Sequence, residues 1–431
     1  MTILISNARL VDPEAASVTQ GAVLLRDGII AEVFDTPTPE ISLDSVPNEN
    51  RRDAKGKYVA PGIVDIGVKI CEPGERHKES YGSAGQAAAA GGVTTIVTRP
   101  DTNPAIDTPE ALEFVRRRAN EAAPVHVLPM AALTKGRDGR EMTEIGFLMD
   151  AGAVAFTDCD RVVRDTKVLS RAMTYARALG ALVVGHPQEP NLSVGAATTS
   201  GKFASLRGLP SVSPMAERMG IDRDIALVEM TGVRYHADQI TTTRALPALE
   251  RAKRNGFDVT AGVSMHHLTL NEYDVADYRT FFKVKPPLRA EDDRQAVVQA
   301  VKTGLIDVIG SFHTPQDEES KRLPFEEAAS GAVGLETMLP VLMRLYHSGD
   351  LDLPTLFRAL SLNPAKRLGL DCGRLSKGAP ADLVLFDPDK PIVLDRFKLK
   401  SKSKNTPFDG ARLQGKVLET FVSGTSVYRS T

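Results

Sequence analysis

Residues Tyr58–Gly74 read YVAPGIVDIGVKICEPG, and this stretch decides how the fold is interpreted. Pro61-Gly62 indicates a turn. The mostly apolar, β-branched run that follows, Ile63–Ile70, has the length and composition of a buried strand. Glu72-Pro73-Gly74 then breaks the strand. The stretch therefore predicts a turn, a buried strand and a second turn, in that order.

Three side chains at the end of this strand are expected to face one side. Gly67, Lys69 and Cys71 occupy alternate positions, and alternate residues of a strand point the same way. In a parallel α/β barrel, catalytic residues gather at the carboxyl ends of the strands. These three positions are therefore the first candidates for catalytic or binding residues.

Bulk composition is that of an ordinary globular protein. The 431 residues are 42% hydrophobic and 25% charged with a formal net charge of −2, so no basic excess favours nucleic acid or an anionic membrane. The 3 cysteines, an odd number, argue against a disulfide framework and favour a reducing cytoplasm. The first residues lack a signal-peptide pattern, and no apolar run of about 18 residues predicts a membrane helix.

Both ends of the chain have strand-like patterns, and the long middle has a different one. Residues 3–34 and 374–431 predict short strands with Gly and Pro turns. In between, strand-like runs lie at 94–98, 126–130, 153–156, 181–185, 259–261 and 306–310, and helical stretches include 85–90 and 109–122. This alternation predicts an α/β body at 57–370 and a β-domain assembled from residues 1–56 and 371–431.

The chain resembles dihydroorotases and related cyclic amidohydrolases along nearly its whole length. The shared motifs, in order, are PGIVDIGVKICEPG (61–74), AAAGGVTT (88–95), RPDTNP (99–104), SMHHL (264–268), FKVKPPLR (282–289), VGLET (333–337) and SKSKNTPF (401–408). The resemblance implies a (β/α)8 TIM barrel of amidohydrolase type with a small composite β-sandwich domain from both termini.

The family's first-strand pattern, PGxxDxHxHxREPG, differs from this chain at three places. Its two metal-binding histidines fall on Gly67 and Lys69, and its substrate-binding arginine falls on Cys71. In the family, a divalent metal lowers the pKa of a bound water to about 7 and polarises the scissile carbonyl. Glycine has no side chain and a protonated lysine repels a cation, so neither position suits a metal ligand.

The other ligand positions implied by the resemblance are kept only in part. The fourth-strand carboxylate matches Asp158, and the fifth-strand histidine matches His186. The sixth-strand histidine falls on Gln239. The eighth-strand aspartate, which also serves as general base, falls on Phe312, so no catalytic residue is expected there. Two of the six ligand positions therefore remain.

The substrate-binding positions differ as well. The asparagine of the family's PNTxP motif is Asp101 here, and the asparagine of its NPPLR motif is Lys285. A carboxylate at the first of these positions would repel an anionic substrate. We define the vestigial pocket as the set Gly67, Lys69, Cys71, Asp101, Asp158, His186, Gln239, Lys285, Phe312 and His313.

Two hypotheses address what replaces the lost metal. Lys69 could supply the missing positive charge, and we expect it to pair with Asp158, because a buried carboxylate without a counter-ion is unstable. Alternatively, Asp158 and His186 could form a residual metal site, helped by His313 or His236, although catalytic zinc needs three protein ligands. The favoured interpretation is that Asp158 and His186 have a structural role only and hydrogen-bond each other or Lys69.

Two further features have both a functional and a structural interpretation. His266-His267 looks like a metal pair, but neighbours on an extended segment face opposite sides, which favours packing. Cys71 and Cys159 could both lie near the vestigial pocket and act as nucleophiles. No activating histidine and acid accompany them, so buried, unreactive thiols are favoured.

The resemblance is greatest to non-catalytic dihydroorotase-like chains that pair with aspartate transcarbamoylase in pyrimidine biosynthesis and that also lack the HxH pair. It implies an inactive cytoplasmic scaffold protein in a homo- or hetero-oligomer, without metal, nucleic acid or membrane. The alternative is an active zinc-dependent dihydroorotase or related cyclic amidohydrolase with a rearranged site. A third interpretation is a binding protein in which Lys69, Lys285 and Arg99 form an anion pocket.

Overall fold

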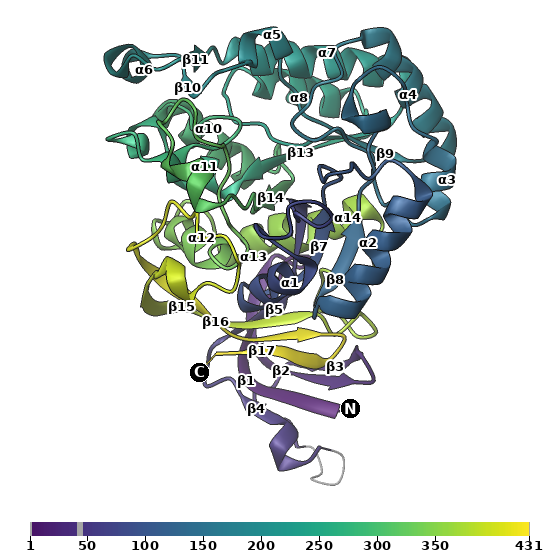
Figure 1. The fold of residues 1–431 in the computed structure, drawn as a ribbon. Coiled ribbons are helices and arrows are strands. Elements are labelled where there is room, and N and C mark those ends of the chain that lie inside the picture. Colours follow the sequence, from purple (N-terminus) through teal and green to yellow (C-terminus); the bar gives the residue numbers. More distant parts are fainter. Residues whose placement is uncertain (1, 41–45, 431) are drawn as a thin grey trace.

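The computed structural model describes residues 2–40 and 46–430, which form a barrel and a smaller β-domain. Figure 1 shows the β-domain below the barrel, with both described chain ends in it. Because the chain starts and finishes in the β-domain, the barrel is inserted between two segments that meet in space. This arrangement is the one that the strand-like patterns at both ends predict.

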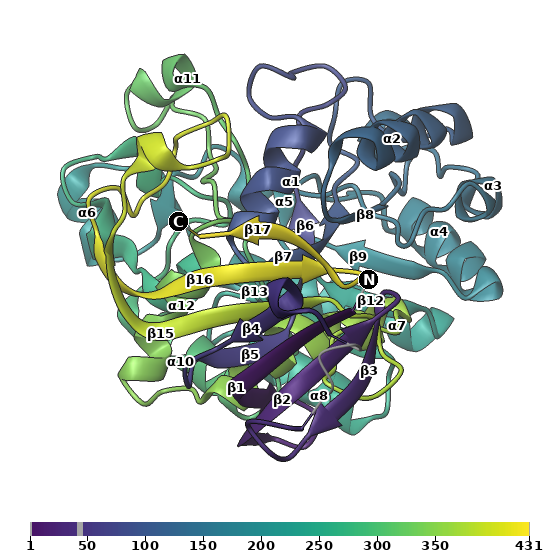
Figure 2. The ribbon, with the colours of Figure 1, turned by 90° about the horizontal axis from the view of Figure 1, so that it is seen from below.

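Strands from both segments pair into one sheet. They are β1 (Thr2–Asp12), β2 (Ser17–Arg26), β3 (Ile29–Phe34), β4 (Arg51–Asp53), β5 (Tyr58–Pro61), β15 (Leu383–Val393), β16 (Arg412–Val422) and β17 (Thr425–Arg429). Their order is β17-β16-β15-β5-β1-β2-β3, with β4 on β1, so the two segments meet where β5 pairs with β15. Figure 2 shows this sheet from below. Ile3, Ile5, Leu25 and Phe421 are fully buried in its core.

The barrel strands are parallel. They are β6 (Ile63–Val68), β7 (Val93–Thr98), β8 (His126–Pro129), β9 (Leu182–Gly185), β12 (Arg234–Ala237), β13 (Val259–Ser264) and β14 (Val308–Gly310). Phe156 supplies the fourth position, because it bridges Ala131 and Val183 in parallel. The Lys69 amide donates to the His313 carbonyl at 2.9 Å and joins the first position to the last. Within the described residues, the predicted (β/α)8 barrel is confirmed.

Helices cover the outside of the barrel (Figure 1). They are α1 (Tyr81–Ala90), α2 (Pro109–Ala122), α3 (Ile145–Asp150), α4 (Thr166–Leu179), α5 (Pro190–Ser193), α6 (Lys202–Arg207), α7 (Met215–Thr231), α8 (Leu246–Arg254), α9 (Met265–Thr269), α10 (Glu291–Lys302), α11 (Glu318–Arg322), α12 (Met338–His347), α13 (Leu353–Phe357) and α14 (Asn363–Leu368). Short strands β10 (Thr198–Thr199) and β11 (Ser211–Val212) flank α6.

Local sequence explains where these helices begin and end. The Thr108 side chain accepts from the Ala111 amide, and Pro109 takes the first position of α2. The Asp165 carboxylate caps α4, which ends at Gly180 with a φ of 69°. In the described part of the chain, no helix combines the length and the apolar character needed to cross a bilayer.

The domain boundaries predicted at residues 56/57 and 370/371 stay predictions. Strand pairing carries the sheet of the β-domain as far as Pro61 at the end of β5, beyond residue 56. The barrel then begins with β6 at Ile63. Pro61-Gly62 therefore marks the passage from one domain to the other.

Candidate functional site

The vestigial pocket lies at the carboxyl ends of the barrel strands. Gly67 lies near the end of β6, and Lys69 follows that strand. His186 follows β9 directly, and Phe312 comes two residues after β14. Because the barrel closes, these positions, distant in sequence, border one opening.

An aromatic ring fills the space beside Gly67. Gly67 has a φ of +94°, and a Cβ placed on it would lie 3.1 Å from Cε1 of Phe312. A Cβ on Gly310 would likewise lie 3.1 Å from Cε2 of the same ring. The Phe312 side chain therefore packs between β6 and β14 and is only 8% exposed. At the position where the resemblance places the general base, there is a buried hydrocarbon ring.

The predicted pairing of Lys69 with Asp158 is wrong. The Lys69 ammonium lies 3.2 Å from Oδ2 of Asp101, and the Arg99 guanidinium lies 3.0 Å from the same oxygen. Burial raises the pKa of the Asp101 carboxyl, but Arg99 and Lys69 outweigh this effect, so its pKa lies below the ordinary value. Lys69 thus neutralises Asp101, which follows β7, and not the carboxylate of the fourth strand position.

Asp158 has hydrogen-bond partners for both carboxylate oxygens without a cation, because two backbone amides and one hydroxyl donate to it. Its Oδ1 accepts from the amides of Leu133 and Thr134, each at 3.0 Å, and its Oδ2 accepts from the Thr134 hydroxyl at 2.5 Å. Burial nevertheless raises the pKa of the carboxyl above its ordinary value. Both carboxylate oxygens are engaged in holding the loop after β8, which leaves Asp158 poorly suited to bind a metal ion.

A double-mutant cycle tests which carboxylate Lys69 faces. We expect Lys69→Met to lower the free energy of unfolding by about 1 kcal/mol, since Arg99 remains to neutralise Asp101. The loss should shrink when Asp101→Asn is present and stay unchanged when Asp158→Asn is present. Urea unfolding of the single and double variants measures both couplings. Coupling to Asp158 in place of Asp101 would contradict the observed geometry.

His186 and Gln239 make few polar contacts in the site. Nδ1 of His186 lies 3.9 Å from Oδ2 of Asp238 and has no hydrogen-bond partner among the described residues. Burial, with Lys285 nearby, lowers the pKa of the His186 imidazole to about 3, so the ring is neutral. Gln239 donates from Nε2 to the Lys285 carbonyl at 3.3 Å. His236, three residues earlier, bonds to the Thr260 hydroxyl at 2.8 Å.

His313 is held in a structural network that sequence reasoning did not find. Its Nδ1 accepts from the Gly334 amide at 3.1 Å, and its Nε2 lies 3.4 Å from Oε2 of Glu79. Both side chains are fully buried, and Glu79 also accepts from the Ser401 hydroxyl. The pKa of Glu79 lies below its ordinary value, because hydrogen bonds and charge from His313 outweigh the effect of burial.

The histidine doublet lies on the short helix α9, so the prediction of an extended segment was wrong. Nδ1 of His266 bonds to the Ser264 hydroxyl at 2.9 Å, and the ring stacks on Phe408. Nε2 of His267 is 3.1 Å from the Pro286 carbonyl. Each ring therefore has a separate packing role, in line with the structural interpretation.

The cysteines near the pocket are poor nucleophiles. Cys71 is 1% exposed and Cys159 is 3% exposed. Burial raises the pKa of each thiol to about 12, so both are protonated near neutral pH. A protonated, inaccessible thiol does not attack a carbonyl.

Asp160 is a central residue of the site that the sequence did not single out. Its carboxylate lies 3.0 Å from Arg137, 3.0 Å from Lys285 and 3.7 Å from Arg99. These cations outweigh burial and hold the pKa of the Asp160 carboxyl well below its ordinary value. The resemblance assigned a role to Asp158 but none to Asp160. The local sequence does not indicate that Asp160 pairs with Arg137, which lies 23 residues away.

The residues present do not fit a zinc centre. Across residues 2–40 and 46–430, no three His, Cys, Asp or Glu side chains gather in a way that could hold a metal ion. The two retained ligand types, Asp158 and His186, border one small gap of about 30 Å³. Catalytic zinc takes three protein ligands with supporting partners, and that set is incomplete here.

The fold and the strand-end positions define a protein of the amidohydrolase class. The L-hydantoinase (dihydropyrimidinase) from Arthrobacter aurescens matches with a TM-score of 0.87 at 25% identity, covering 99% of this chain and 96% of that one. The dihydropyrimidinase from Brevibacillus agri NCHU1002 has a TM-score of 0.84 at 21% identity, covering 100% of this chain and 95% of that one, and supports the fold alone.

Sequence comparison then gives the family. A model described as "Dihydro-orotase-like" matches residues 56–245, and one described as "Amidohydrolase family" matches residues 328–428. The dihydroorotase of Syntrophus aciditrophicus (strain SB) is 37% identical over 430 residues, covering 100% of both chains. That of Wolbachia sp. subsp. Drosophila simulans (strain wRi) is 38% identical over 99% of this chain and 95% of its own. The chain belongs to the dihydroorotase family.

Proposed function

We propose that this chain is a catalytically inactive member of the dihydroorotase family that serves, in the cytoplasm, as a structural partner of aspartate transcarbamoylase in pyrimidine biosynthesis. One observation carries the inactivity: the Phe312 ring packs against Gly67 where the family chemistry needs a base and a histidine. The partner is proposed from the likeness to non-catalytic family members that lack the HxH pair.

The physical argument concerns the metal. Hydrolysis of a cyclic amide in this family depends on a metal that activates water and polarises the carbonyl. Lys69 places an ammonium near this opening and is already paired with Asp101. Asp158 is held by backbone amides. A cation brought to this place would meet one positive charge, one hydrocarbon ring and an engaged carboxylate.

The second candidate function is an active cyclic amidohydrolase with a rearranged site. It is favoured by relatives that carry the name dihydroorotase and match this chain over its whole length. Such an enzyme would have to recruit ligands by moving Asp158 and His186 from their present contacts. Metal content and turnover separate the two candidates.

For the chain purified without chelator, we expect less than about 0.1 zinc ion per chain and no hydrolysis of dihydroorotate, because four of the six ligand positions are replaced and catalytic zinc needs three protein ligands. Metal analysis by mass spectrometry, before and after dialysis against zinc, and a turnover assay measure this. Zinc near one per chain, with turnover that is lost in His186→Ala, would establish the second candidate.

Partnership requires its own experiment. We expect the chain and the catalytic chain of aspartate transcarbamoylase from the same organism to co-elute in size-exclusion chromatography. The transcarbamoylase should also keep its activity for longer on heating when this chain is present, since binding stabilises the folded partner. Separate elution and unchanged heat inactivation would reject the scaffold role while leaving the question of turnover open.

A further inference from the structure

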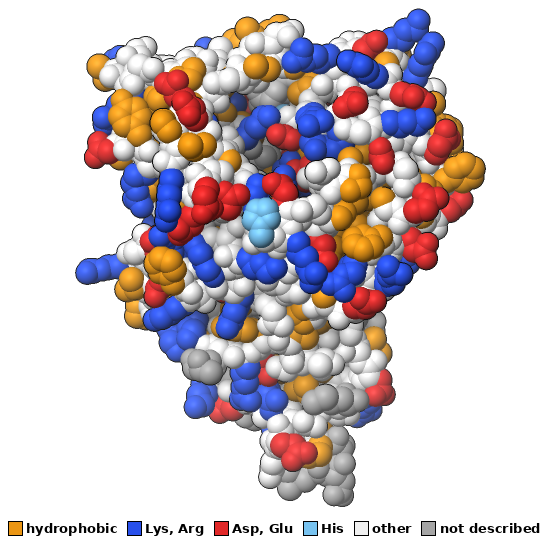
Figure 3. Space-filling view, in the orientation of Figure 1, with side chains coloured by type: hydrophobic (Ala, Val, Ile, Leu, Met, Phe, Trp, Pro, Cys, Tyr) orange, Lys and Arg blue, Asp and Glu red, His pale blue; other side chains and the backbone are white. Residues whose placement is uncertain are grey.

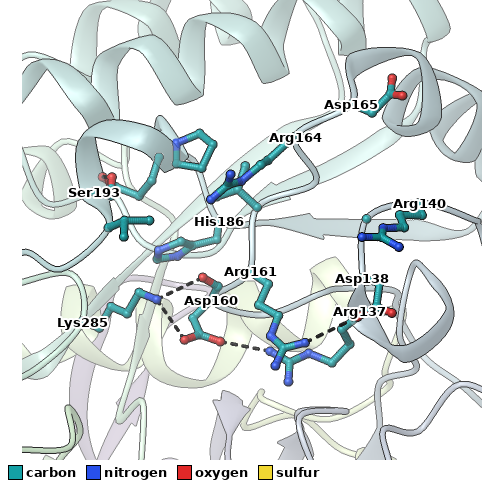
Figure 4. Close-up of a pocket in the computed structure, with 15 residues that line it drawn as sticks. Arg137, Asp138, Arg140, Asp160, Arg161, Arg164, Asp165, His186, Ser193 and Lys285 are labelled. Carbon is teal, nitrogen blue, oxygen red and sulfur yellow. Dashed lines mark hydrogen bonds and ion pairs between the residues drawn. The ribbon is translucent and has the colours of Figure 1, made fainter.

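A cleft borders the vestigial pocket on the side of the loops that follow β8 and Phe156. It has a volume of about 560 Å³, and both His186 and Lys285 line it (Figure 4). Cavities of this size hold small organic molecules. Figure 3 shows a hollow in the barrel half of the molecule with Lys and Arg side chains on its border. Of the family's substrate positions, Lys285 lines this cleft, whereas Cys71 and Asp101 do not.

The lining of the cleft has an excess of positive charge. Five Arg or Lys side chains and three Asp side chains face it. Asp160 is engaged by Arg137 and Lys285, each at 3.0 Å. Asp165 caps α4 and accepts from two backbone amides, so its charge is used at the helix end. The carboxylates therefore leave part of the positive charge uncompensated.

The uncompensated charge belongs to arginines on the rim. Within the described part of the chain, no carboxylate lies within ion-pair distance of Arg140 or Arg164, and both side chains are exposed. Arg161 has only a long contact, 3.8 Å from Asp138. Figure 4 places Arg140, Arg161 and Arg164 around the same space as His186. Guanidinium groups suit phosphate and carboxylate oxygens, because their N–H donors form a planar fork.

His186 adds a polar group to the lining of the cleft. Its side chain is almost completely buried, and its Nδ1 has no hydrogen-bond partner in the part of the chain described. This nitrogen is therefore available to hydrogen-bond a ligand.

We propose that this cleft binds a small molecule that carries at least two negative charges on phosphate or carboxylate groups. Arg140 and Arg164 contact the anionic groups, and Lys285 and His186 contact the part of the ligand nearest the barrel. The site does not depend on catalysis by the chain, because none of these contacts requires a metal or a general base. Its role is ligand binding at the mouth of the barrel.

Isothermal titration calorimetry on the full chain, at constant ionic strength near neutral pH, tests this proposal. The probes are inorganic phosphate and the dicarboxylate succinate, and the variants are Arg140→Gln and Arg164→Gln. Arg117→Gln on α2 is the matched control, an exposed arginine with no carboxylate partner among residues 2–40 and 46–430 and outside the cleft. Thermal unfolding of each variant checks that the fold is unchanged.

We expect saturable binding of at least one probe, weakened about ten-fold by each cleft variant and unchanged in the control, because a charge-assisted hydrogen bond is lost. Tighter binding of phosphate would identify a phosphorylated ligand, and tighter binding of succinate a dicarboxylate. The proposal is overturned if neither probe binds saturably, or if Arg117→Gln weakens binding as much as the cleft variants do.

Discussion

Phe312→Ala is expected to lower the free energy of unfolding by about 3 kcal/mol, the cost of removing a buried phenylalanine ring and leaving a cavity. The ring is 8% exposed and packs between Gly67 and Gly310. Phe312 has a φ of 47°, and alanine keeps the Cβ that makes this conformation unfavourable. The backbone strain is therefore similar in both proteins, and the difference reports packing.

Chemical unfolding followed by circular dichroism measures this loss. Phe397→Ala is the control, because Phe397 is 67% exposed, and we expect it to change stability by no more than about 0.5 kcal/mol. The variant should also bind no more zinc than the natural chain, since Gly67 and Lys69 still cannot act as ligands. Stoichiometric zinc in Phe312→Ala would mean that the ring alone excludes the metal and that a sufficient ligand set exists beneath it.

Glu217→Ala is expected to cost about 3–5 kcal/mol, the range for leaving one partner of a buried ion pair without its counter-ion. The Glu217 side chain is 0% exposed, and its Oε2 lies 3.3 Å from the Arg289 guanidinium, itself 2% exposed. Oε1 of Glu217 accepts from the Thr241 and Thr242 amides, each at 2.8 Å. The substitution therefore leaves the buried Arg289 guanidinium without a counter-ion. It also leaves the two backbone amides without an acceptor.

The matched control is Glu250→Ala on α8. Glu250 pairs with Arg254 at 3.0 Å, but the two side chains are 60% and 72% exposed, so we expect a loss of no more than about 0.5 kcal/mol. Thermal and urea unfolding compare the two variants. A similar small loss for both would show that solvent reaches the Glu217–Arg289 pair, against its burial in the structure.

This buried pair also bears on the cleft. Thr241 follows the Gln239 position by two residues, and Arg289 follows Lys285 by four. Glu217 on α7 thus holds both loops in place through one carboxylate. Its loss is expected to weaken anion binding as well as stability, because Lys285 would no longer be held in its place beside the cleft.

Much of the fold followed from the sequence. The alternation of strand-like and helical runs predicted an α/β body, and the resemblance implied that this body is a barrel. The helix α2 was placed at the residues that it occupies, 109–122. The fourth strand was predicted at 153–156, and there β-bridges form only at Phe156, although Val154 also donates to the Pro129 carbonyl at 3.1 Å. The histidine doublet was placed on an extended segment and lies on α9. Boundaries and short elements depend on tertiary contacts, which local pattern does not contain.

By itself, the sequence determined which chemical groups stand at each strand end. Where the resemblance places metal ligands, a glycine and a phenylalanine supply no donor atom and a protonated lysine repels a cation, wherever the loops lie. Only the tertiary structure decided which groups pair. Lys69 faces Asp101 and not Asp158, and Asp160 gathers Arg137 and Lys285. These distances depend on how separate βα loops fold over the barrel. The sequence does not determine the pairing, because a charged side chain attracts whichever opposite charge the fold brings close to it.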